Sequence, residues 1–157
     1  MTDEMEILLI EDNPADVEIT LRAFQKYHLA NKIHVVRDGE EALECLFGTG
    51  RYAERSVCSG IRLILLDLKL PKVDGIEVLQ RSKSDPRTKN IPVVVLTSSR
   101  EENDLIDTYN LGVNSYIVKP VDFPLFAEAI RQLGSYWIVL NQLPSDFHSQ
   151  GKRVGSP

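Results

Sequence analysis

Polar side chains that could do chemistry follow four short apolar segments of this chain. Three are carboxylates, one is a hydroxyl and one is an ammonium: Glu11, Asp12, Asp67, Thr97 and Lys119. If these groups converge, the three carboxylates repel each other strongly in a partly desolvated cleft unless a cation neutralises them. Oxygen ligands with open positions suit Mg²⁺, which keeps several waters and binds through one or two carboxylates and a phosphate. The residue types therefore predict a Mg²⁺ site that a phosphate completes.

The apolar segments before these residues must be neighbouring strands if the polar groups are to meet. Five short apolar runs alternate with helical patterns, and we predict a strand at each: Glu6–Ile10, Ile33–Val36, Leu63–Leu66, Pro92–Leu96 and Ser115–Val118. Strands that alternate with helices predict a parallel sheet with helices on both faces. Ligands of such a sheet bind beyond the carboxyl ends of its strands. The predicted fold class is therefore α/β, with a doubly wound parallel sheet.

Capping residues predict where the helices begin. A residue suited to the N-cap precedes each helical pattern: Asn13, Asp38, Asp74, Ser99 and Asp122. The last helix is predicted to run to about Leu140, and Gly48–Gly60 is predicted to be a long polar connection. One domain over residues 4–143 follows, with a Gly-, Pro- and Ser-rich tail over 144–157 that we expect to be disordered.

Composition excludes several classes of protein. The 157 residues carry a formal net charge of −5, which argues against a nucleic-acid partner because such binders are usually basic. No apolar run approaches the roughly 18 residues of a membrane span, and the acidic start lacks the features of a secretory signal. Cys45 and Cys58 match neither a disulfide framework nor a metal-ligand spacing. We therefore expect reduced thiols, a cytoplasmic protein and no membrane partner.

Five motifs in order make the chain resemble a response-regulator receiver domain of two-component signalling. They are ILLIEDNPAD, LILLDLKLPKVDGIEVL, VVVLTSS, LGVNSYIVKP and the final helix, and together they cover about residues 5–142. The resemblance implies a flavodoxin-like (βα)5 fold in a single domain, with strand order 2-1-3-4-5. A chemotaxis member of the family is a known example of that order.

The resemblance also implies a role for each polar residue. Asp67 matches the phosphoacceptor, whose carboxylate attacks a phosphohistidine of a sensor histidine kinase and forms an acyl phosphate. Asp12 and Asp67 match the side-chain ligands of Mg²⁺, and the backbone carbonyl of Lys69 matches the third protein ligand. Glu11 replaces the more usual Asp, and its longer side chain is expected to reach the metal through water, with direct contact as the alternative. The protein is then no enzyme in the usual sense, but a phosphoacceptor that promotes its own phosphorylation and dephosphorylation.

Three further positions match the phosphoryl-binding and signalling parts of the family. Lys119 matches the ammonium that binds a phosphoryl oxygen, and Thr97 matches the hydroxyl that turns toward the phosphate. Tyr116 matches the aromatic switch residue, whose ring moves into the space that Thr97 leaves. The charge added at Asp67 would thereby bias a surface made by the fourth helix, fifth strand and fifth helix.

The output is expected to be an interaction of the receiver itself. Only 17 residues follow Leu140, too few for a DNA-binding domain, so we predict a stand-alone receiver. The last helix carries a second apolar set beside its core-facing stripe, either as a wide stripe or as the surface of a homodimer or partner complex: Leu125, Ala129, Tyr136, Val139 and Leu143. The SYWIVLNQLP ending and the Gly48–Gly60 connection look most like receivers that partner bacterial phytochrome-type histidine kinases. A light-sensing kinase is therefore a hypothesis by analogy.

Three rival readings stay open at this point. A haloacid-dehalogenase-type phosphatase also uses a strand-end Asp, a Lys and Mg²⁺, but it needs an acid two residues after the nucleophile, where this chain has Lys69. A pseudo-receiver would keep the fold without phosphorylation, although such modules typically lose an acid or the Lys. A flavodoxin-like cofactor binder would need a Ser-, Thr- or Gly-rich loop after the first strand, where this chain has the acidic EDNPAD.

Overall fold

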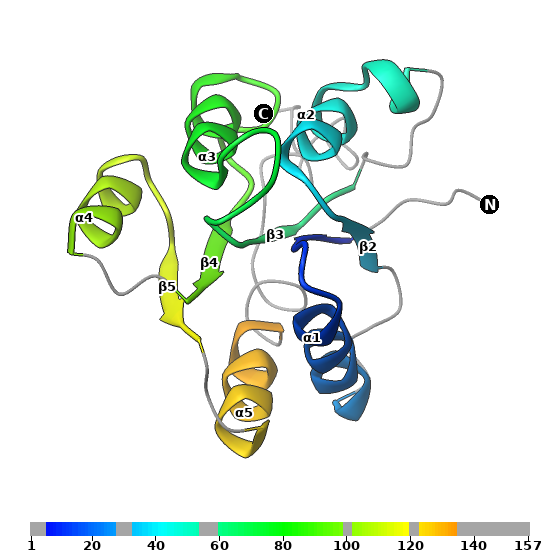
Figure 1. Ribbon diagram of the computed structural model, residues 1–157, viewed down its shortest axis with the longest axis vertical. Coiled ribbons are helices and arrows are strands. Elements are labelled where there is room, and N and C mark those ends of the chain that lie inside the picture. Colours follow the sequence, from blue (N-terminus) through cyan, green and yellow to red (C-terminus); the bar gives the residue numbers. More distant parts are fainter. Residues whose placement is uncertain (1–5, 28–32, 54–59, 99–101, 120–122, 135–157) are drawn as a thin grey trace, which may run out of the picture.

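The computed structural model describes residues 6–27, 33–53, 60–98, 102–119 and 123–134. Within these ranges strands and helices alternate along the chain (Figure 1). The strands are β1 (Ile7–Ile10), β2 (Ile33–Val36), β3 (Leu63–Leu66), β4 (Val93–Thr97) and β5 (Ser115–Val118). The α-helices are α1 (Pro14–Lys26), α2 (Gly39–Phe47), α3 (Gly75–Ser84), α4 (Glu102–Asn110) and α5 (Phe123–Gly134).

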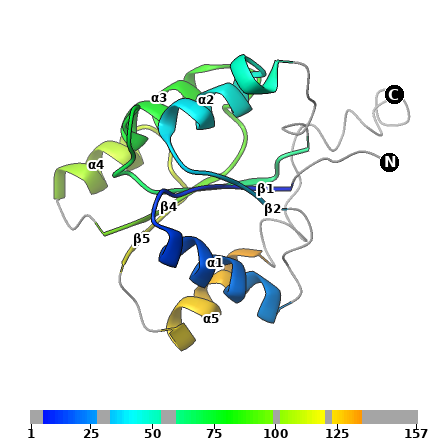
Figure 2. The same ribbon diagram turned by 45° about the vertical axis from the view of Figure 1, so that its right-hand side comes forward.

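The strands form one parallel sheet in the order β2-β1-β3-β4-β5. Figure 2 shows this sheet nearly edge-on, with α1 and α5 on one face and α2 and α3 on the other. Helices on both faces leave the central strands without access to water, which explains why their sequences are solidly apolar rather than alternating. The predicted α/β class and the strand order implied by the resemblance are confirmed.

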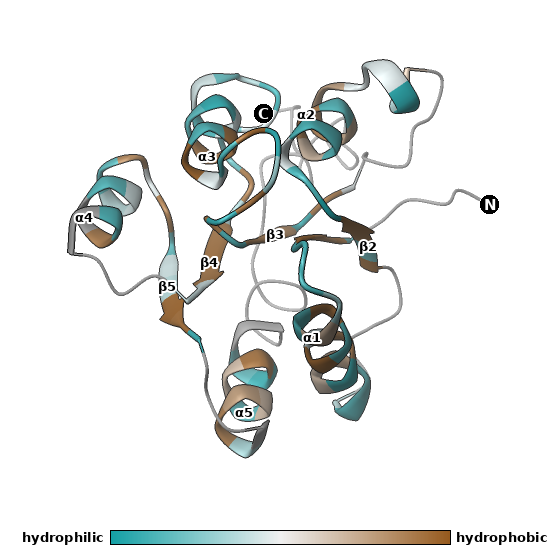
Figure 3. Ribbon diagram, in the orientation of Figure 1, coloured by the Kyte–Doolittle hydropathy of each residue, from teal (hydrophilic) through white to brown (hydrophobic). Residues whose placement is uncertain are grey.

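Alternate residues of each strand fill two separate cores. On β1, Leu8 and Ile10 pack with the cluster beneath α2 and α3, while Ile7 and Leu9 pack with the cluster beneath α1 and α5. This division follows from the two-residue period of a strand. Figure 3 shows mostly apolar strands between helices that carry both polar and apolar residues. The helices α1 and α5 contact each other directly, and this pair covers the second core.

The predicted N-caps are confirmed where the structure describes them. The side chain of Asn13 accepts hydrogen bonds from the backbone N–H groups of Ala15 and Asp16, at 2.9 and 3.2 Å. Asp38 and Asp74 likewise accept from backbone N–H groups in the first turns of α2 and α3. These bonds satisfy donors that have no partner within the helix. The predicted caps Ser99 and Asp122 lie outside the described residues.

The segment after α2 is more structured than a polar connection. Gly50–Tyr52 forms a 3₁₀ turn, and the Tyr52 side chain is buried although its segment is polar overall. Its hydroxyl donates to Glu41 at 2.8 Å and lies 2.7 Å from Nε2 of His34. The turn therefore packs back onto α2 and β2. The overall polarity of the segment gave no sign of this packing, which involves the single buried ring of Tyr52.

One sequence prediction about the cysteines is wrong. Cys45 on α2 is fully buried and disulfide-bonded, not a reduced thiol. The other cysteine of the sequence, Cys58, lies outside the described residues. Chain spacing could not reveal the bond, since a disulfide depends on the approach of two segments in space.

The structure describes the predicted domain except for parts of its two ends and the gaps named above. Residues 4 and 5, the predicted end of the last helix near Leu140 and the predicted tail 144–157 lie outside the described residues. Among the helices that are described, none has the length and hydrophobicity that crossing a membrane requires.

Candidate functional site

The predicted polar residues lie at one edge of the sheet because the backbone ladder continues into them. The N–H of Glu11 bonds to Val36 at 3.0 Å, and the N–H of Asp67 bonds to Ile10 at the same distance. At the other side of the sheet, the N–H of Lys119 bonds to the carbonyl of Thr97 at 2.7 Å. These bonds hold the first residues after β1, β3 and β5 at the same edge of the sheet as Thr97, the last residue of β4. This is the edge at which open parallel sheets bind ligands.

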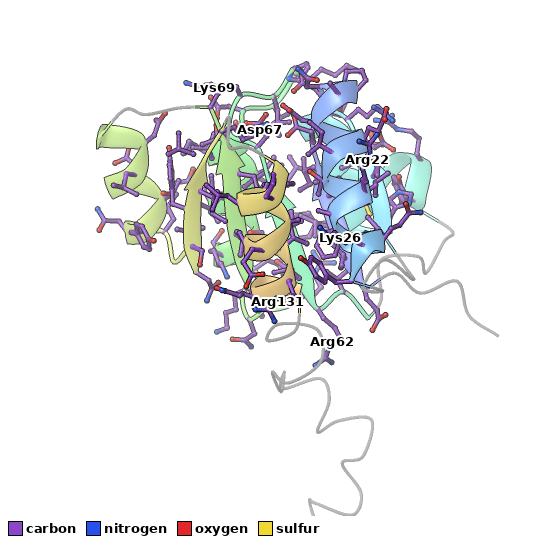
Figure 4. The ribbon with its side chains drawn as sticks, turned by 90° about the horizontal axis from the view of Figure 1, so that it is seen from below. Arg22, Lys26, Arg62, Asp67, Lys69 and Arg131 are labelled. Atoms are coloured by element: carbon purple, nitrogen blue, oxygen red, sulfur yellow. The ribbon has the colours of Figure 1, made fainter. Side chains whose placement is uncertain are left out.

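The side-chain view shows the two ends of the sheet (Figure 4). Asp67 and Lys69 lie at the carboxyl ends of the strands, and Arg62 and Arg131 lie toward the opposite end. The edge of the sheet that carries Asp67, called the acidic edge below, is therefore well separated from Arg62 and Arg131.

Three carboxylates gather closely at the acidic edge. One oxygen from each of Glu11, Asp12 and Asp67 lies within 4.8 Å of the others. Glu11 and Asp67 are buried, with exposed fractions of 3% and 7%, and Asp12 is the most exposed of the three. The predicted convergence of the three carboxylates is confirmed, and their oxygen atoms are the kind of ligand that Mg²⁺ prefers.

Lys119 enters this cluster from β5 and makes three ion pairs. Its ammonium lies 2.7 Å from Oε1 of Glu11, 2.8 Å from Oδ2 of Asp16 and 3.5 Å from Oδ2 of Asp67. The Lys119 side chain is only 13% exposed, so these pairs are largely shielded from water. The Lys119 ammonium pairs with three carboxylates, and Asp12 lies beside two of them. The carboxylates outnumber this ammonium, so the site is electrostatically suited to a divalent cation.

The environment shifts the pKa values of two of these groups. Burial raises the pKa of Glu11 to about 7; Lys119 opposes this shift and Asp67 adds to it. Burial acts to lower the pKa of the Lys119 ammonium, but its hydrogen bonds to Asp16 and Glu11 outweigh burial, and that pKa is raised. Lys119 therefore stays protonated at neutral pH, while Glu11 titrates close to neutrality.

The loop between β3 and α3 is held close to Asp67. The N–H of Lys69 donates to Oδ1 of Asp67 at 3.2 Å, and the N–H of Gly75 donates to the carbonyl of Leu68 at 3.0 Å. A Cβ atom at Gly75 would lie 2.5 Å from the carbonyl oxygen of Asp67. The first residue of α3 can therefore lie this close to the Asp67 backbone only if it is glycine. The ammonium of Lys69 pairs with Asp104 on α4 at 3.7 Å and is largely exposed. The backbone of Lys69 is thus held beside Asp67, whereas its ammonium pairs with Asp104.

Thr97 and Tyr116 lie on neighbouring strands and on the same face of the sheet. Tyr116 pairs in register with Val95, which points to the same face as Thr97 two residues later. Thr97 is fully buried, and Tyr116 is partly buried against the core beneath α2 and α3. The two residues predicted to form a switch therefore share one face of the sheet, and their role as a switch stays a prediction.

Sequence reasoning missed Asp16 as a member of the site. Asp16 stands three residues after the N-cap Asn13, where an acidic side chain is usually explained by helix capping. No local signal distinguishes that role from an ion pair with a distant Lys. The predicted surface on the last helix is only partly described: Leu125 is 65% exposed, Ala129 is half-buried, and Tyr136, Val139 and Leu143 lie outside the described residues.

Comparisons with known proteins agree with this geometry. A family model for the response regulator receiver domain matches residues 7–131. The chain is 42% identical over 142 residues to the probable methanogenesis regulatory protein FilR2 of Methanothrix harundinacea, covering 90% of this chain and 89% of that protein. It is 39% identical over 139 residues to the response regulator Rcp1 of Synechocystis sp., covering 88% and 92% of the two chains.

Solved structures of similar proteins share the whole fold. The structure of the phosphorylated cyanobacterial phytochrome response regulator RcpA aligns with a TM-score of 0.80 at 40% identity, over 90% of this chain and 99% of that one. The Mn²⁺-bound form of Rcp1 aligns with a TM-score of 0.79 at 37% identity, over 89% and 99% of the two chains.

Proposed function

Because the chain belongs to the response regulator receiver domain family, we propose that Asp67 is the residue through which it receives its signal. A carboxylate oxygen of Asp67 attacks the phosphorus atom of a phosphohistidine on a sensor histidine kinase. The bond between phosphorus and the histidine nitrogen breaks, and an acyl phosphate forms on Asp67. The observation that carries this assignment is the position of Asp67 itself, buried at the carboxyl edge, 3.5 Å from the Lys119 ammonium and beside two further carboxylates.

The surrounding residues compensate the charge that the phosphoryl group brings. Asp12, Asp67 and the backbone carbonyl of Lys69 would hold Mg²⁺, with Glu11 contributing through water. When bound, this ion supplies positive charge against the phosphoryl oxygens, which is where most catalysis of phosphoryl transfer arises. The Lys119 ammonium takes one phosphoryl oxygen. The Mn²⁺-bound Rcp1 structure supports a divalent metal in a protein of this type.

The phosphoryl group is then read out by the pair Thr97 and Tyr116. The Thr97 hydroxyl turns toward the phosphate, and the Tyr116 ring occupies the space released on the same face of the sheet. Their shared face and neighbouring strands support this coupling. The surface formed by α4, β5 and α5 changes as a result.

A phytochrome-type histidine kinase is the proposed partner. RcpA is a cyanobacterial phytochrome response regulator and supports the assignment at 40% identity. FilR2, at 42% identity, is a probable methanogenesis regulatory protein, so sequence similarity alone does not select the kinase partner. Phosphotransfer from a panel of purified kinases tests the partner, and no preference for a phytochrome-linked kinase would count against it.

The output is proposed to be a homodimer or partner contact through the last helix and β5, in a stand-alone receiver. Relatives of nearly the same length support the stand-alone form, because the chain covers 89% of FilR2 and 92% of Rcp1. Leu125, 65% exposed on α5, supports an interaction surface there.

One experiment tests the central proposal. The protein is incubated with Mg²⁺ and acetyl phosphate, and the labile phosphate is measured on phosphate-affinity gels. We expect one phosphate per chain, lost on Asp67→Asn and on removal of Mg²⁺. A phosphate that survives Asp67→Asn refutes the assignment, and a wild-type chain that takes up no phosphate is a pseudo-receiver.

A further inference from the structure

The Lys119 ammonium is held mainly by groups other than the proposed phosphoacceptor. Its short contacts go to Glu11 at 2.7 Å and Asp16 at 2.8 Å, while Asp67 lies 3.5 Å away. An ammonium has three N–H donors, and two are taken by these short contacts. To bind a phosphoryl oxygen on Asp67 strongly, Lys119 has to weaken or exchange one of them.

The two short contacts differ in how firmly each carboxylate is held. Glu11 is buried, and its second oxygen accepts the N–H of Asn13 at 3.2 Å. The Asp16 side chain is 32% exposed, compared with 4% for Glu11. Water can therefore solvate the Asp16 carboxylate when it loses its ammonium, whereas an abandoned Glu11 carboxylate stays desolvated. Asp16 is the contact that is released at the lower cost in free energy.

Helix capping does not account for the position of the Asp16 side chain. In a capping box the acid three residues after the N-cap accepts the N–H of the N-cap residue. Here that N–H, on Asn13, is already bonded to Glu11. The Asp16 carboxylate instead reaches across to β5 and pairs with Lys119, 103 positions away in the chain. Its orientation is therefore explained by the ammonium.

We propose that Asp16 is a positioning residue for Lys119, holding the ammonium before phosphorylation and releasing it to the phosphoryl group on Asp67. The inference rests on the proposed function of Asp67. In this proposal Asp16 competes with the phosphoryl group, because both attract the ammonium of Lys119. Removing the charge of Asp16 frees Lys119 and also reduces repulsion of the incoming anion, and both effects strengthen phosphoryl binding.

The probe is beryllium fluoride with Mg²⁺, a mimic of the phosphoryl group, and its dissociation constant is measured by ¹⁹F NMR. We expect Asp16→Asn to tighten binding by about threefold to tenfold. Asp16→Glu restores the charge and should bring the constant back toward that of the wild type. Glu18→Gln is the matched control, because it removes one charge from an exposed side chain of the same helix that pairs with Arg22 instead. It should leave the constant unchanged.

Repeating the measurement in a Lys119→Gln variant separates the positioning of Lys119 from a general effect of the Asp16 charge. In Lys119→Gln, Asp16→Asn should lose most of its effect, because the competition for the ammonium is gone. Unchanged or weaker binding in Asp16→Asn, or equal tightening in the Lys119→Gln background, overturns the inference. If the wild-type chain itself binds no beryllium fluoride, the proposed function fails instead.

A measurement on the wild-type chain avoids any dependence on variant folding. The ¹³C signal of the Asp16 carboxyl group should move toward that of a solvated carboxylate on adding beryllium fluoride and Mg²⁺, while the Glu18 signal stays in place. An unchanged Asp16 signal in a chain that binds the probe overturns the proposal.

Discussion

The N–H of Gly39, the first residue of α2, donates a hydrogen bond to the carbonyl oxygen of Pro71 in the loop that follows Asp67. A Cβ atom at Gly39 would lie 1.9 Å from the carbonyl oxygen of Val73 in that loop. Lys72 in the same loop has a positive φ of 68° and pairs with Asp38 at 3.7 Å. The start of α2 therefore supports the loop whose Lys69 carbonyl is proposed to bind Mg²⁺.

Gly39→Ala should weaken Mg²⁺ binding as well as stability. The loop has to move away from the added methyl group, at a cost of about 1–3 kcal/mol typical of overpacking. Isothermal titration with Mg²⁺ and urea denaturation measure the two effects. Gly112→Ala is the control: its φ of 100° strains any other residue, yet among the described residues a Cβ there meets only the Lys83 side chain, at 3.8 Å. It should lose stability and keep its Mg²⁺ affinity, and equal Mg²⁺ affinities in the two variants would contradict this role of Gly39.

The raised pKa of Glu11 predicts a pH dependence of stability in the absence of metal. The folded state keeps a proton on Glu11 up to about pH 7, whereas the unfolded chain loses it near its ordinary pKa of 4.5. Between these values the folded state binds more protons, so the free energy of unfolding contributed by Glu11 falls as pH rises. At about 1.4 kcal/mol per pH unit, the upper limit of this loss is about 3 kcal/mol. Urea denaturation of the metal-free protein across this range measures it, and Glu11→Gln should flatten the curve.

The same titration predicts how Mg²⁺ binding depends on pH. Ionised Glu11 adds negative charge to the site, so Mg²⁺ should bind more tightly as pH rises through about 7. Isothermal titration at several pH values measures this trend. In Glu11→Gln the dependence near neutrality should disappear, and a wild-type affinity that is flat across this range would show that Glu11 does not contribute.

The link between Thr97 and Tyr116 predicts a variant that is phosphorylated but does not respond. Thr97→Val removes the hydroxyl in a fully buried position, and acetyl phosphate should still modify Asp67 because the nucleophile is intact. The Tyr116 ring signals in NMR spectra should shift on phosphorylation in the wild type and not in this variant. Thr97→Ser keeps the hydroxyl and is the control, in which the shift should return. A full Tyr116 response in Thr97→Val would rule out the proposed coupling.

Leu125 is the described residue that best tests the proposed dimer. Leu125→Glu places a charge on a side chain that is 65% exposed and should dissociate a dimer formed through α5. Ile19→Glu on α1 alters another partly exposed apolar residue, 39% exposed, and should leave the dimer intact. Light scattering with and without phosphorylation measures the mass. A wild-type chain that is monomeric in both states would exclude the dimer.

Local sequence patterns were sufficient to predict the strands, the helix starts and which residues group at most of the site. Apolar runs such as those at β1 and β3 mark buried parallel strands, and Asn13, Asp38 and Asp74 mark helix starts, because these signals act over a few residues. Once the strands are parallel, residues just after them must share one edge. This geometry is why Glu11, Asp12, Asp67, Thr97 and Lys119 could be grouped before any coordinates, with the family resemblance supplying the strand order and the individual roles.

Contacts between distant segments could not be obtained in this way. The pairing of Asp16 with Lys119 spans 103 positions and depends on α1 beginning at the edge of the sheet where β5 ends. The approach of Gly39 to the loop after Asp67, the burial of Tyr52 and the disulfide of Cys45 likewise depend on how helices and turns pack. Residue types and spacing specify which groups are available, whereas the distances between their atoms, and so which carboxylate holds the ammonium, are set by packing across the whole sheet.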